Sequence, residues 1–458
     1  MEYSSMGKGG APFRHAIDWQ SEAFYDRDAL DRETRRVFDV CHGCRRCFNL
    51  CDSFPRLFDL IDQSETGELD GVSSRDFGQV VEACTLCDMC FMVKCPYVPP
   101  HELNIDFPHL MLRHRAIDHA GGKVGLVERR LAQTDANGRL ARHLAPLVNW
   151  AGDRKNRPVR ALLSRLAGID ADARLPKYHA RTFQGRAKVT VPEVNREAPA
   201  SGRKAVLFAT CFVNYNDPPV GEAARAVLAR NGVETEVVYP TCCGMPFLEQ
   251  GNIGEVAERA RQISRELLPW IEKGFDIVSL VPSCTLMMKI EWPLILPEDA
   301  ALKTLAAHAF DIGEYVVDIA RKEGLADGMR PLAGGVTLQV ACHERAQNMG
   351  LKSADMLRLI PDTPITVIER CSGHGGTFGV KKKTHATALK VGKPVARQAR
   401  EAGNRYVASE CPLAAAHIVE GMAKLSDGAP GEGMPEEGRA HHPIELLARA
   451  YGVTGRTL

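Results

Sequence analysis

Eight of the chain's 15 cysteines form two runs of closely similar spacing. The first run reads C-x2-C-x2-C-x3-C and the second reads C-x2-C-x2-C-x4-C-P, and together they comprise Cys41, Cys44, Cys47, Cys51, Cys84, Cys87, Cys90 and Cys95. Three cysteines at steps of three allow one turning loop to direct three thiolates at three irons of a cubane, while the fourth iron needs a ligand from elsewhere. The two runs therefore predict two [4Fe–4S] clusters.

The fourth cysteine of each run is expected to serve the other run's cluster, which is the rule in ferredoxins with two clusters. That rule predicts one cluster on Cys41, Cys44, Cys47 and Cys95, and a second on Cys84, Cys87, Cys90 and Cys51. The pattern departs from the simplest form, since Asp52 rather than proline follows Cys51, the last gap is one residue longer, and 32 residues separate the runs. Zinc is the alternative occupant, but it would leave thiols of a triple run without a role.

Charged and imidazole side chains lie beside these runs in the sequence. Lys94, Arg45, Arg46 and Arg56 would stabilise an anionic cluster, or are ordinary surface residues. His101, Asp106 and His109 follow the second run and would relay protons or bind metal, or else cap a helix and satisfy buried backbone. Both alternatives stay open at the level of sequence.

The other seven cysteines form two groups with nearly equal steps. The first group is Cys211, Cys242, Cys243 and Cys284, with steps of 31 and 41 residues. The second group is Cys342, Cys371 and Cys411, with steps of 29 and 40 residues. Each group sits at the ends of expected strands, so the repeated spacing predicts an internal duplication into two α/β units.

The first group is expected to bind a metal or a cluster, because the carboxyl ends of parallel strands converge where ligands bind. Gly244, next to the adjacent pair, would let the backbone approach closely. The second group has Ser372 in place of the second adjacent cysteine. Either His343 or His374 joins its three cysteines, or a coordination position stays open for substrate, or the half-site is empty.

Apolar runs that read as buried strands would position these cysteines. They cover residues 204–210, 234–239, 276–281, 336–341, 365–369 and 405–410, with helical stretches between them, which predicts parallel sheets. Residues 121–190 differ, because they carry 15 Lys and Arg against five Asp and Glu, a net charge of +10, and no cysteine. This segment predicts short Arg-rich helices, and residues 191–203 are expected to be a linker.

Composition excludes several classes of protein. The chain has 458 residues, of which 45% are hydrophobic, and its net charge of +1 and 6% aromatic content give no reason to expect nucleic-acid binding. The odd number of cysteines and the lack of a signal-like apolar stretch in the first twenty residues argue against a disulfide framework. No run reaches the roughly 20 apolar residues of a membrane span. We therefore expect a cytoplasmic protein, with at most peripheral contact at the inner face of the cell membrane.

Together these motifs resemble those of the heterodisulfide reductase-related family, which includes the iron–sulfur subunits of anaerobic glycerol-3-phosphate dehydrogenase and of glycolate and lactate oxidases. The resemblance covers about residues 41–100 and 204–424. It implies two ferredoxin motifs followed by two cysteine-rich CCG domains. The fullest family pattern has five cysteines per domain, which can hold a non-cubane cluster, whereas Met287 and Ala414 stand here where the last cysteines would fall. A conventional [4Fe–4S] cluster on the first group is therefore at least an equal expectation.

We thus expect an α+β multidomain chain, with a helical bis-[4Fe–4S] ferredoxin-like domain followed by a pseudo-two-fold pair of α/β CCG units. The expected divisions are residues 1–120 for the two-cluster domain, 121–203 for a basic helical connector and linker, 204–330 for the first CCG unit, and 331–458 for the second with a C-terminal helix. The +10 segment is the expected docking place for an acidic partner or an anionic membrane surface.

The resemblance implies an iron–sulfur subunit that relays electrons between a flavoprotein or peroxidase-type oxidoreductase and a quinone or other carrier. No G-x-G-x-x-G motif follows an expected strand, so a flavin or NAD site is expected on a partner. The alternative function is a catalytic thiol–disulfide reductase that acts near Cys242, Cys243 and Cys371.

Overall fold

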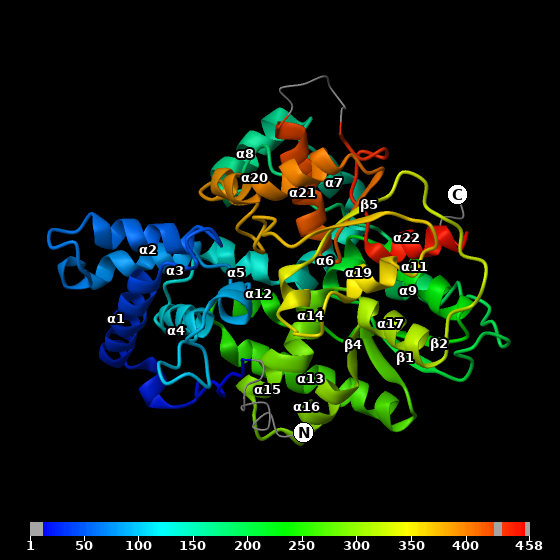
Figure 1. Cartoon of the computed structure of the whole chain (residues 1–458), viewed down its shortest axis with the longest axis horizontal. Coiled ribbons are helices and arrows are strands. Elements are labelled where there is room, and N and C mark those ends of the chain that lie inside the picture. Colours follow the sequence, from blue (N-terminus) through cyan, green and yellow to red (C-terminus); the bar gives the residue numbers. More distant parts are fainter. Residues whose placement is uncertain (1–11, 426–432, 454–458) are drawn as a thin grey trace.

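The computed structural model describes residues 12–425 and 433–453. Figure 1 shows a helical lobe at one end of the longest axis, which contains α1 to α4, and a larger body that contains the strands. The elements of the lobe are η2 (Glu22–Tyr25), α1 (Arg27–Cys44), α2 (Ser53–Asp62), η3 (Leu69–Gly71), η4 (Ser74–Phe77), α3 (Gly78–Ala83), the π-helical turn η5 (Cys90–Lys94) and α4 (Phe107–Ala120).

The 32 residues between the two cysteine runs supply much of the lobe's core. Within α2, Phe54, Leu57, Phe58 and Ile61 recur at helical spacing, and all four are buried. The ring of Phe54 packs against that of Phe107 in α4, with centroids 4.7 Å apart. The insertion is therefore a folded part of the lobe, and it packs α2 against α4.

The basic segment forms a series of short helices between the lobe and the sheets. They are α5 (Leu126–Ala132), α6 (Thr134–His143), α7 (Ala145–Gly152), α8 (Arg157–Ala167) and α9 (Phe183–Ala187). The short Arg-rich helices predicted from the sequence are confirmed by α5 and α8, and residues 191–203 contain neither helix nor strand.

The first sheet is parallel and four-stranded, in the order β2-β1-β3-β4. Its elements are β1 (Lys204–Phe208), α10 (Cys211–Tyr215), α11 (Pro218–Arg230), β2 (Glu234–Val238), α12 (Met245–Leu248), α13 (Ile253–Glu272), β3 (Asp276–Ser279), α14 (Pro282–Leu286), η6 (Met287–Glu291), α15 (Trp292–Ile295), α16 (Ala300–His308), β4 (Ala309–Asp311) and α17 (Ile312–Lys322). Residues 205–208 of β1 are all buried, as expected for a central parallel strand covered on both faces.

The second sheet is parallel and three-stranded, in the order β6-β5-β7. Its elements are β5 (Val336–Gln339), α18 (Cys342–Arg345), α19 (Lys352–Leu357), β6 (Ile365–Ile368), α20 (His385–Ala402), β7 (Tyr406–Ala408), α21 (Pro412–Lys424) and the C-terminal helix α22 (Pro443–Ala450). In both sheets the first strand of the unit lies between the second and the third. The internal duplication predicted from the cysteine spacing is therefore confirmed.

All six predicted strands are present, each shorter at its carboxyl end or at both ends than the apolar run suggested. The seventh, β4, was not predicted, because three residues are too few to show an alternation or an apolar run. Among the helices in the described parts of the chain, none is long and apolar enough to cross a lipid bilayer.

Candidate functional site

The first cysteine run lies where α1 ends. Cys41 and Cys44 belong to the last turn of α1, and Arg45 ends the helix in the left-handed conformation, so that the chain turns before Cys47. Burial and the charges of Cys95, Cys47 and Cys44 raise the pKa of the Cys41 thiol. Burial and the charges of Cys95 and Cys44 likewise raise the pKa of Cys47 to about 12. Cys95, which ends the second run, thus lies among the cysteines of the first.

The first three cysteines of the second run likewise lie beside the last cysteine of the first run. Burial and the charges of Cys87 and Cys84 raise the pKa of Cys51. Burial and the charges of Cys87, Cys84 and Cys51 raise the pKa of Cys90. We call Cys41, Cys44, Cys47 and Cys95 the outer set, and Cys51, Cys84, Cys87 and Cys90 the inner set. The exchange of the fourth cysteine between the runs is the arrangement expected of two-cluster ferredoxins.

Two of the four neighbouring cations act on the outer set. Lys94 and Arg46 lower the pKa of Cys47 against the stronger effect of burial. Arg45 is instead paired with Asp62, and Arg56 with Asp52. Sequence position alone could not separate the two kinds of cation.

In the first unit, four cysteines follow three neighbouring strands. Cys211 begins α10 after β1, Cys242 and Cys243 lie in the loop after β2, and Cys284 lies in α14 after β3. The sulfur atoms of Cys211 and Cys242 are 3.9 Å apart. Hydrogen bonds with the thiols of Cys211 and Cys243 lower the pKa of Cys242, whereas hydrogen bonds with Cys242 and Cys284, together with burial, raise that of Cys243. The four sulfur atoms thus form one continuous group.

Asp135, which sequence reasoning missed, holds the loop of this group from the connector. Its carboxylate accepts hydrogen bonds from the Cys242 backbone N–H at 2.9 Å and from the Thr241 hydroxyl at 2.8 Å, and it pairs with Arg259 at 2.8 Å. The one feature of the sequence that could have pointed to Asp135 is that it is one of only five acidic residues in the +10 segment. Behind the loop, Trp292 donates its indole N–H to the carbonyl of Cys243 at 3.1 Å.

In the second unit, the three cysteines occupy the corresponding positions. Cys342 begins α18 after β5, Cys371 lies in the loop after β6, and Cys411 caps α21 after β7. Burial and the charges of Cys87, Cys371 and Cys411 raise the pKa of Cys342. Burial and the charge of Cys371 raise the pKa of Cys87 to about 12. Cys342 and Cys371 of the second unit therefore face the inner set of the lobe.

The residues expected to complete the second group have other contacts. Ser372 lies within 3.5 Å of the His374 backbone N–H, which donates to its hydroxyl. His343 hydrogen-bonds through Nδ1 to the Ser283 hydroxyl at 2.8 Å and through Nε2 to the Leu86 carbonyl at 3.3 Å. Burial lowers the pKa of His374 to about 3, so this imidazole is neutral. His343 thus joins the first unit, the second unit and the lobe, rather than presenting a free nitrogen.

One cavity of about 680 Å³ collects the cysteines of both units. All seven line it, together with Cys87 of the inner set, and the connector closes another part of its wall with α7 residues 148, 149 and 152. Glu249 also lines it, and burial raises the pKa of this carboxyl to about 7. The two halves, which the sequence predicts as separate sites, are two walls of one cavity. Within the described residues no group of three or more His, Cys, Asp or Glu is arranged to hold a single metal ion.

The polar residues after the second run have structural roles. Asp106 caps α4, accepting from the His109 N–H at 3.1 Å, and it pairs with Arg14 at 2.9 Å. The His101 ring accepts from the Leu103 N–H at 3.1 Å. Although burial opposes it, the charges of His109 and Arg14 lower the pKa of Glu291 to about 2. Asp106 thus caps a helix and His101 satisfies a backbone N–H, as the second alternative expected, and His109 and Glu291 tie the lobe to the first unit.

Comparison with known proteins agrees with this arrangement. A family model described as a cysteine-rich domain, CCG, matches residues 205–289 and 336–418, once in each unit. One subunit of the anaerobic glycerol-3-phosphate dehydrogenase of Escherichia coli K12 is 29% identical over 323 residues, which is 70% of this chain and 76% of that protein. Lactate utilization protein A of Bacillus pumilus is 33% identical over 190 residues, 39% of this chain and 75% of that protein. One subunit of the fumarate reductase (CoM/CoB) of Methanothermobacter marburgensis is 25% identical over 404 residues, 85% of this chain and 76% of that protein.

Proposed function

We propose, because the chain belongs to the family of heterodisulfide reductase-related iron–sulfur subunits with two CCG domains, that it is the electron-transfer subunit of a multi-subunit oxidoreductase. It would relay electrons between a flavoprotein or peroxidase-type partner and a quinone or other carrier. One observation carries the proposal: the outer set, the inner set and the second unit's cysteines follow one another from the lobe to the cavity.

The thiol sets fit iron–sulfur clusters by their chemistry. Buried thiols in groups of four raise one another's pKa, so such groups favour the thiolate form only around a cationic core. We assign one [4Fe–4S] cluster to the outer set, a second to the inner set, and a further cluster to Cys211, Cys242, Cys243 and Cys284. Clusters bound there would accept and pass on single electrons. Cys342, Cys371 and Cys411 provide three further ligands at the cavity.

The protein's own residues would insulate and tune this path. The aromatic core of α2 and α4 excludes water from one side of the lobe, and Lys94 and Arg46 offset negative charge at the outer set. His343 fixes the lobe's loop at Leu86 against both units, which keeps Cys87 beside the cavity.

Metal analysis of anaerobically purified protein tests the assignment. We expect at least about eight irons per chain, with equal acid-labile sulfide, because two cubanes require that number. A lower count would remove the assignment of clusters to both lobe sets. Replacement of Cys51 and Cys95 by serine, one at a time, should each abolish one of two lobe signals in electron paramagnetic resonance.

A second function is favoured by the cavity, which has the volume of a small-molecule site. In that function the chain would itself reduce a disulfide near Cys242, Cys243 and Cys371. Reduction of a disulfide by the isolated chain with an artificial electron donor would support catalysis. Electron exchange with dyes alone would support the relay function.

A further inference from the structure

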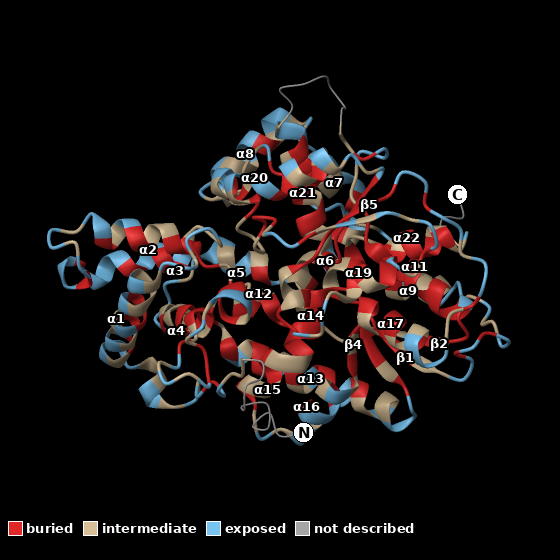
Figure 2. Cartoon of the chain, viewed as in Figure 1, coloured by how far each residue is buried: buried red, intermediate tan, exposed pale blue. Residues whose placement is uncertain are grey.

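Three buried imidazoles of the second unit form a row between the cavity and the connector. His374 lies in the loop after β6 and lines the cavity. His417 lies in α21, and His385 begins α20. The ring centroids of His374 and His417 are 6.3 Å apart, and those of His417 and His385 are 6.2 Å apart. Figure 2 shows most of α21, which carries the middle ring of the row, in the colour of buried residues.

Two of these imidazoles keep a nitrogen without a hydrogen bond in the interior. The Nδ1–H of His385 donates to the Gly379 carbonyl at 2.7 Å, since a carbonyl can only accept. The Nε2 atoms of His385 and His417 are buried and form no hydrogen bond within the described residues. Burying a polar atom without a hydrogen bond is unfavourable, so these two nitrogens call for a role. The surrounding described residues do not converge as the ligands of one metal ion would.

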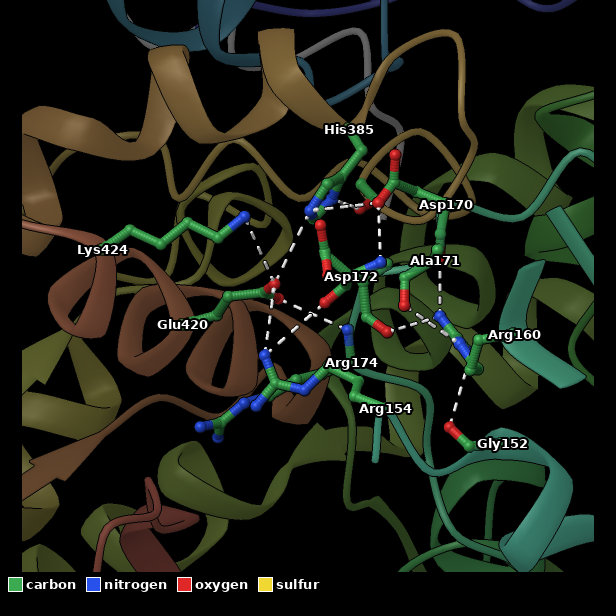
Figure 3. A network of polar contacts seen from close by, with 12 residues as sticks. Gly152, Arg154, Arg160, Asp170, Ala171, Asp172, Arg174, His385, Glu420 and Lys424 are labelled. Atoms are coloured by element: carbon green, nitrogen blue, oxygen red, sulfur yellow. Dashed lines mark hydrogen bonds and ion pairs between the residues drawn. The ribbon is translucent and has the colours of Figure 1, made fainter. Parts of the chain in front are cut away.

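The outer end of the row faces two carboxylates. Nε2 of His385 lies 3.6 Å from Oε1 of Glu420 and 3.9 Å from Oδ1 of Asp170 (Figure 3). Oε1 of Glu420 also forms no hydrogen bond within the described residues. A neutral imidazole nitrogen and a carboxylate oxygen are both acceptors, so they attract each other only when a proton is bound between them. The side chain of Asp170 is 24% exposed, which lets protons reach this end from water.

Charged groups surround this outer end. Arg154 of the connector lies 3.8 Å from Oε1 of Glu420, and Lys424 of α21 lies 4.0 Å from it. Asp172, whose pKa is lowered first by its hydrogen bond with Arg157, also feels the charge of His385. Acidic and basic groups thus keep the outer end polar, as suits a place that takes up protons.

The inner end of the row is apolar by comparison. Burial and the charges of His417 and His343 lower the pKa of His374 to about 3. Burial also lowers the pKa of His417, although a hydrogen bond to the Ala388 carbonyl and the charge of Glu420 oppose it. Both rings are therefore neutral near pH 7. A neutral imidazole can accept a proton at one nitrogen and release another from the second nitrogen, which is how histidine shuttles protons.

We propose that His385, His417 and His374 conduct protons from the surface at Asp170 into the cavity. Each ring accepts a proton at one nitrogen and releases one from the other, so the row carries protons without a net change in its own charge. One water or a rotation of a ring closes each gap between neighbouring rings.

This path rests on the proposed function, because it serves an acceptor that takes protons together with electrons. A quinone takes two electrons and two protons to become a quinol, and a disulfide takes the same to become two thiols. An acceptor that fills the cavity excludes water from the cysteines, so its protons need a route through the cavity wall. His374 opens this route on the cavity that all seven cysteines of the two units line.

Stopped-flow reoxidation of the full-length chain, purified anaerobically, reduced with dithionite and then freed of it, tests the path. Hexaammineruthenium(III) accepts one electron and no proton, whereas menadione accepts two electrons and two protons. His417→Ala should slow reoxidation by menadione at least about tenfold at about pH 8, because positioned proton transfer is lost. Reoxidation by the ruthenium complex should change less than about twofold. Added imidazole should restore part of the menadione rate, which a purely structural defect would not allow.

His114→Ala is the matched control. This imidazole of α4 is hydrogen-bonded to the Thr34 hydroxyl at 2.7 Å and lies outside the row, so its loss should leave both rates unchanged. The pH profile gives a second measurement. The menadione rate of the wild type should stay level from about pH 6 to about pH 9, whereas that of His417→Ala should fall as pH rises, because only protons from bulk water then reach the cavity.

Four outcomes would overturn the path. The first is an equal menadione rate in the wild type and His417→Ala. The second is a wild type that the ruthenium complex reoxidises but menadione does not, since electron relay would stand without an acceptor that needs protons. The third is a slower menadione rate in Glu249→Gln alone, which would assign proton delivery to that cavity carboxyl. The fourth is one zinc per chain that His417→Ala loses, which would make the row a metal site. Fewer than about eight irons per chain would instead remove the proposed function and the path together.

Discussion

The two CCG units share one sheet order but differ in what their cysteines face. The first unit has four cysteines that contact one another, and its loop is held by Asp135 of the connector. The second unit has three, of which Cys342 faces Cys87 of the lobe and Cys371 faces Cys87 and Cys51. The unit with one cysteine fewer is therefore the one whose cysteines adjoin the inner set. We infer that the duplicated fold has divided two tasks, a self-contained thiol group in one half and contact with the lobe in the other.

The largest expected difference between the units is spectroscopic. Cys243→Ser should abolish the first unit's paramagnetic signal and leave the two signals of the lobe unchanged. The reason is that the cysteines that shift the pKa of Cys243 are Cys242 and Cys284, both of the first unit. Cys371→Ser should instead alter the inner set's signal, since the charge of Cys371 acts on Cys51 and Cys87. Low-temperature electron paramagnetic resonance of dithionite-reduced samples is the measurement. The reverse result would mean that the cysteines of the first unit, not those of the second, lie beside the inner set.

The next difference concerns two corresponding glycines after the central cysteines. Gly244 and Gly373 both have positive φ, which costs an L-residue roughly 1–2 kcal/mol. A Cβ at Gly244 would meet Val256 no closer than 3.4 Å, whereas one at Gly373 would overlap the Ala388 carbonyl oxygen and lie 2.8 Å from the Gly392 nitrogen. Gly244→Ala should thus cost about 1–2 kcal/mol and Gly373→Ala about 3–5 kcal/mol, because backbone overlap adds to the strain.

Urea unfolding of the two alanine variants measures that difference. Each should be followed by circular dichroism beside the wild-type chain under the same anaerobic conditions. Equal losses in the two variants would mean that α20, which carries Ala388 and Gly392, moves away without cost. The close approach of α20 to the loop that carries Cys371 would then not make the second unit more sensitive to an added methyl group than the first.

These contrasts also mark the limit of sequence reasoning. Six strands could be predicted because each contains a short apolar or β-branched stretch between helical stretches, and the cysteine sets because their spacing is regular. The approach of Cys371 to Cys87 and the shared cavity could not, since no local pattern records contacts between residues so far apart in the chain. Asp135 was missed for the same reason: a single carboxylate in a basic helix reveals nothing about the backbone N–H that it holds.

The carboxylate that joins the connector to the first unit has more hydrogen bonds than the one that joins it to the second. This contrast predicts a smaller difference in unfolding free energy. Asp135 is satisfied by Thr241, Cys242 and Arg259 of the first unit. The network with the second unit centres on Glu420, which lies 3.8 Å from Arg154 and accepts from the Arg174 backbone N–H at 3.4 Å, while its Oε1 has no hydrogen-bond partner (Figure 3). Asp135→Asn should cost about 1.5–3 kcal/mol, the range for hydrogen bonds to charged groups, and Glu420→Gln about 1 kcal/mol. Urea midpoints of both variants test this, and a larger loss in Glu420→Gln would contradict it.

The smallest effect is the pH dependence of the Asp135 contribution. Although burial opposes it, hydrogen bonds from Tyr239 and Cys242 and from Arg259 lower the pKa of Asp135 in the folded protein. A carboxyl whose folded pKa lies below its unfolded value of about 3.9 stabilises the fold fully above that value, and loses the contribution as pH falls through the folded pKa. The gap in unfolding free energy between wild type and Asp135→Asn should therefore be constant from pH 7 to about pH 5 and narrow below about pH 4. A gap that stays constant to pH 3 would mean that Asp135 holds the first unit's loop by the shape of its contacts rather than by its charge.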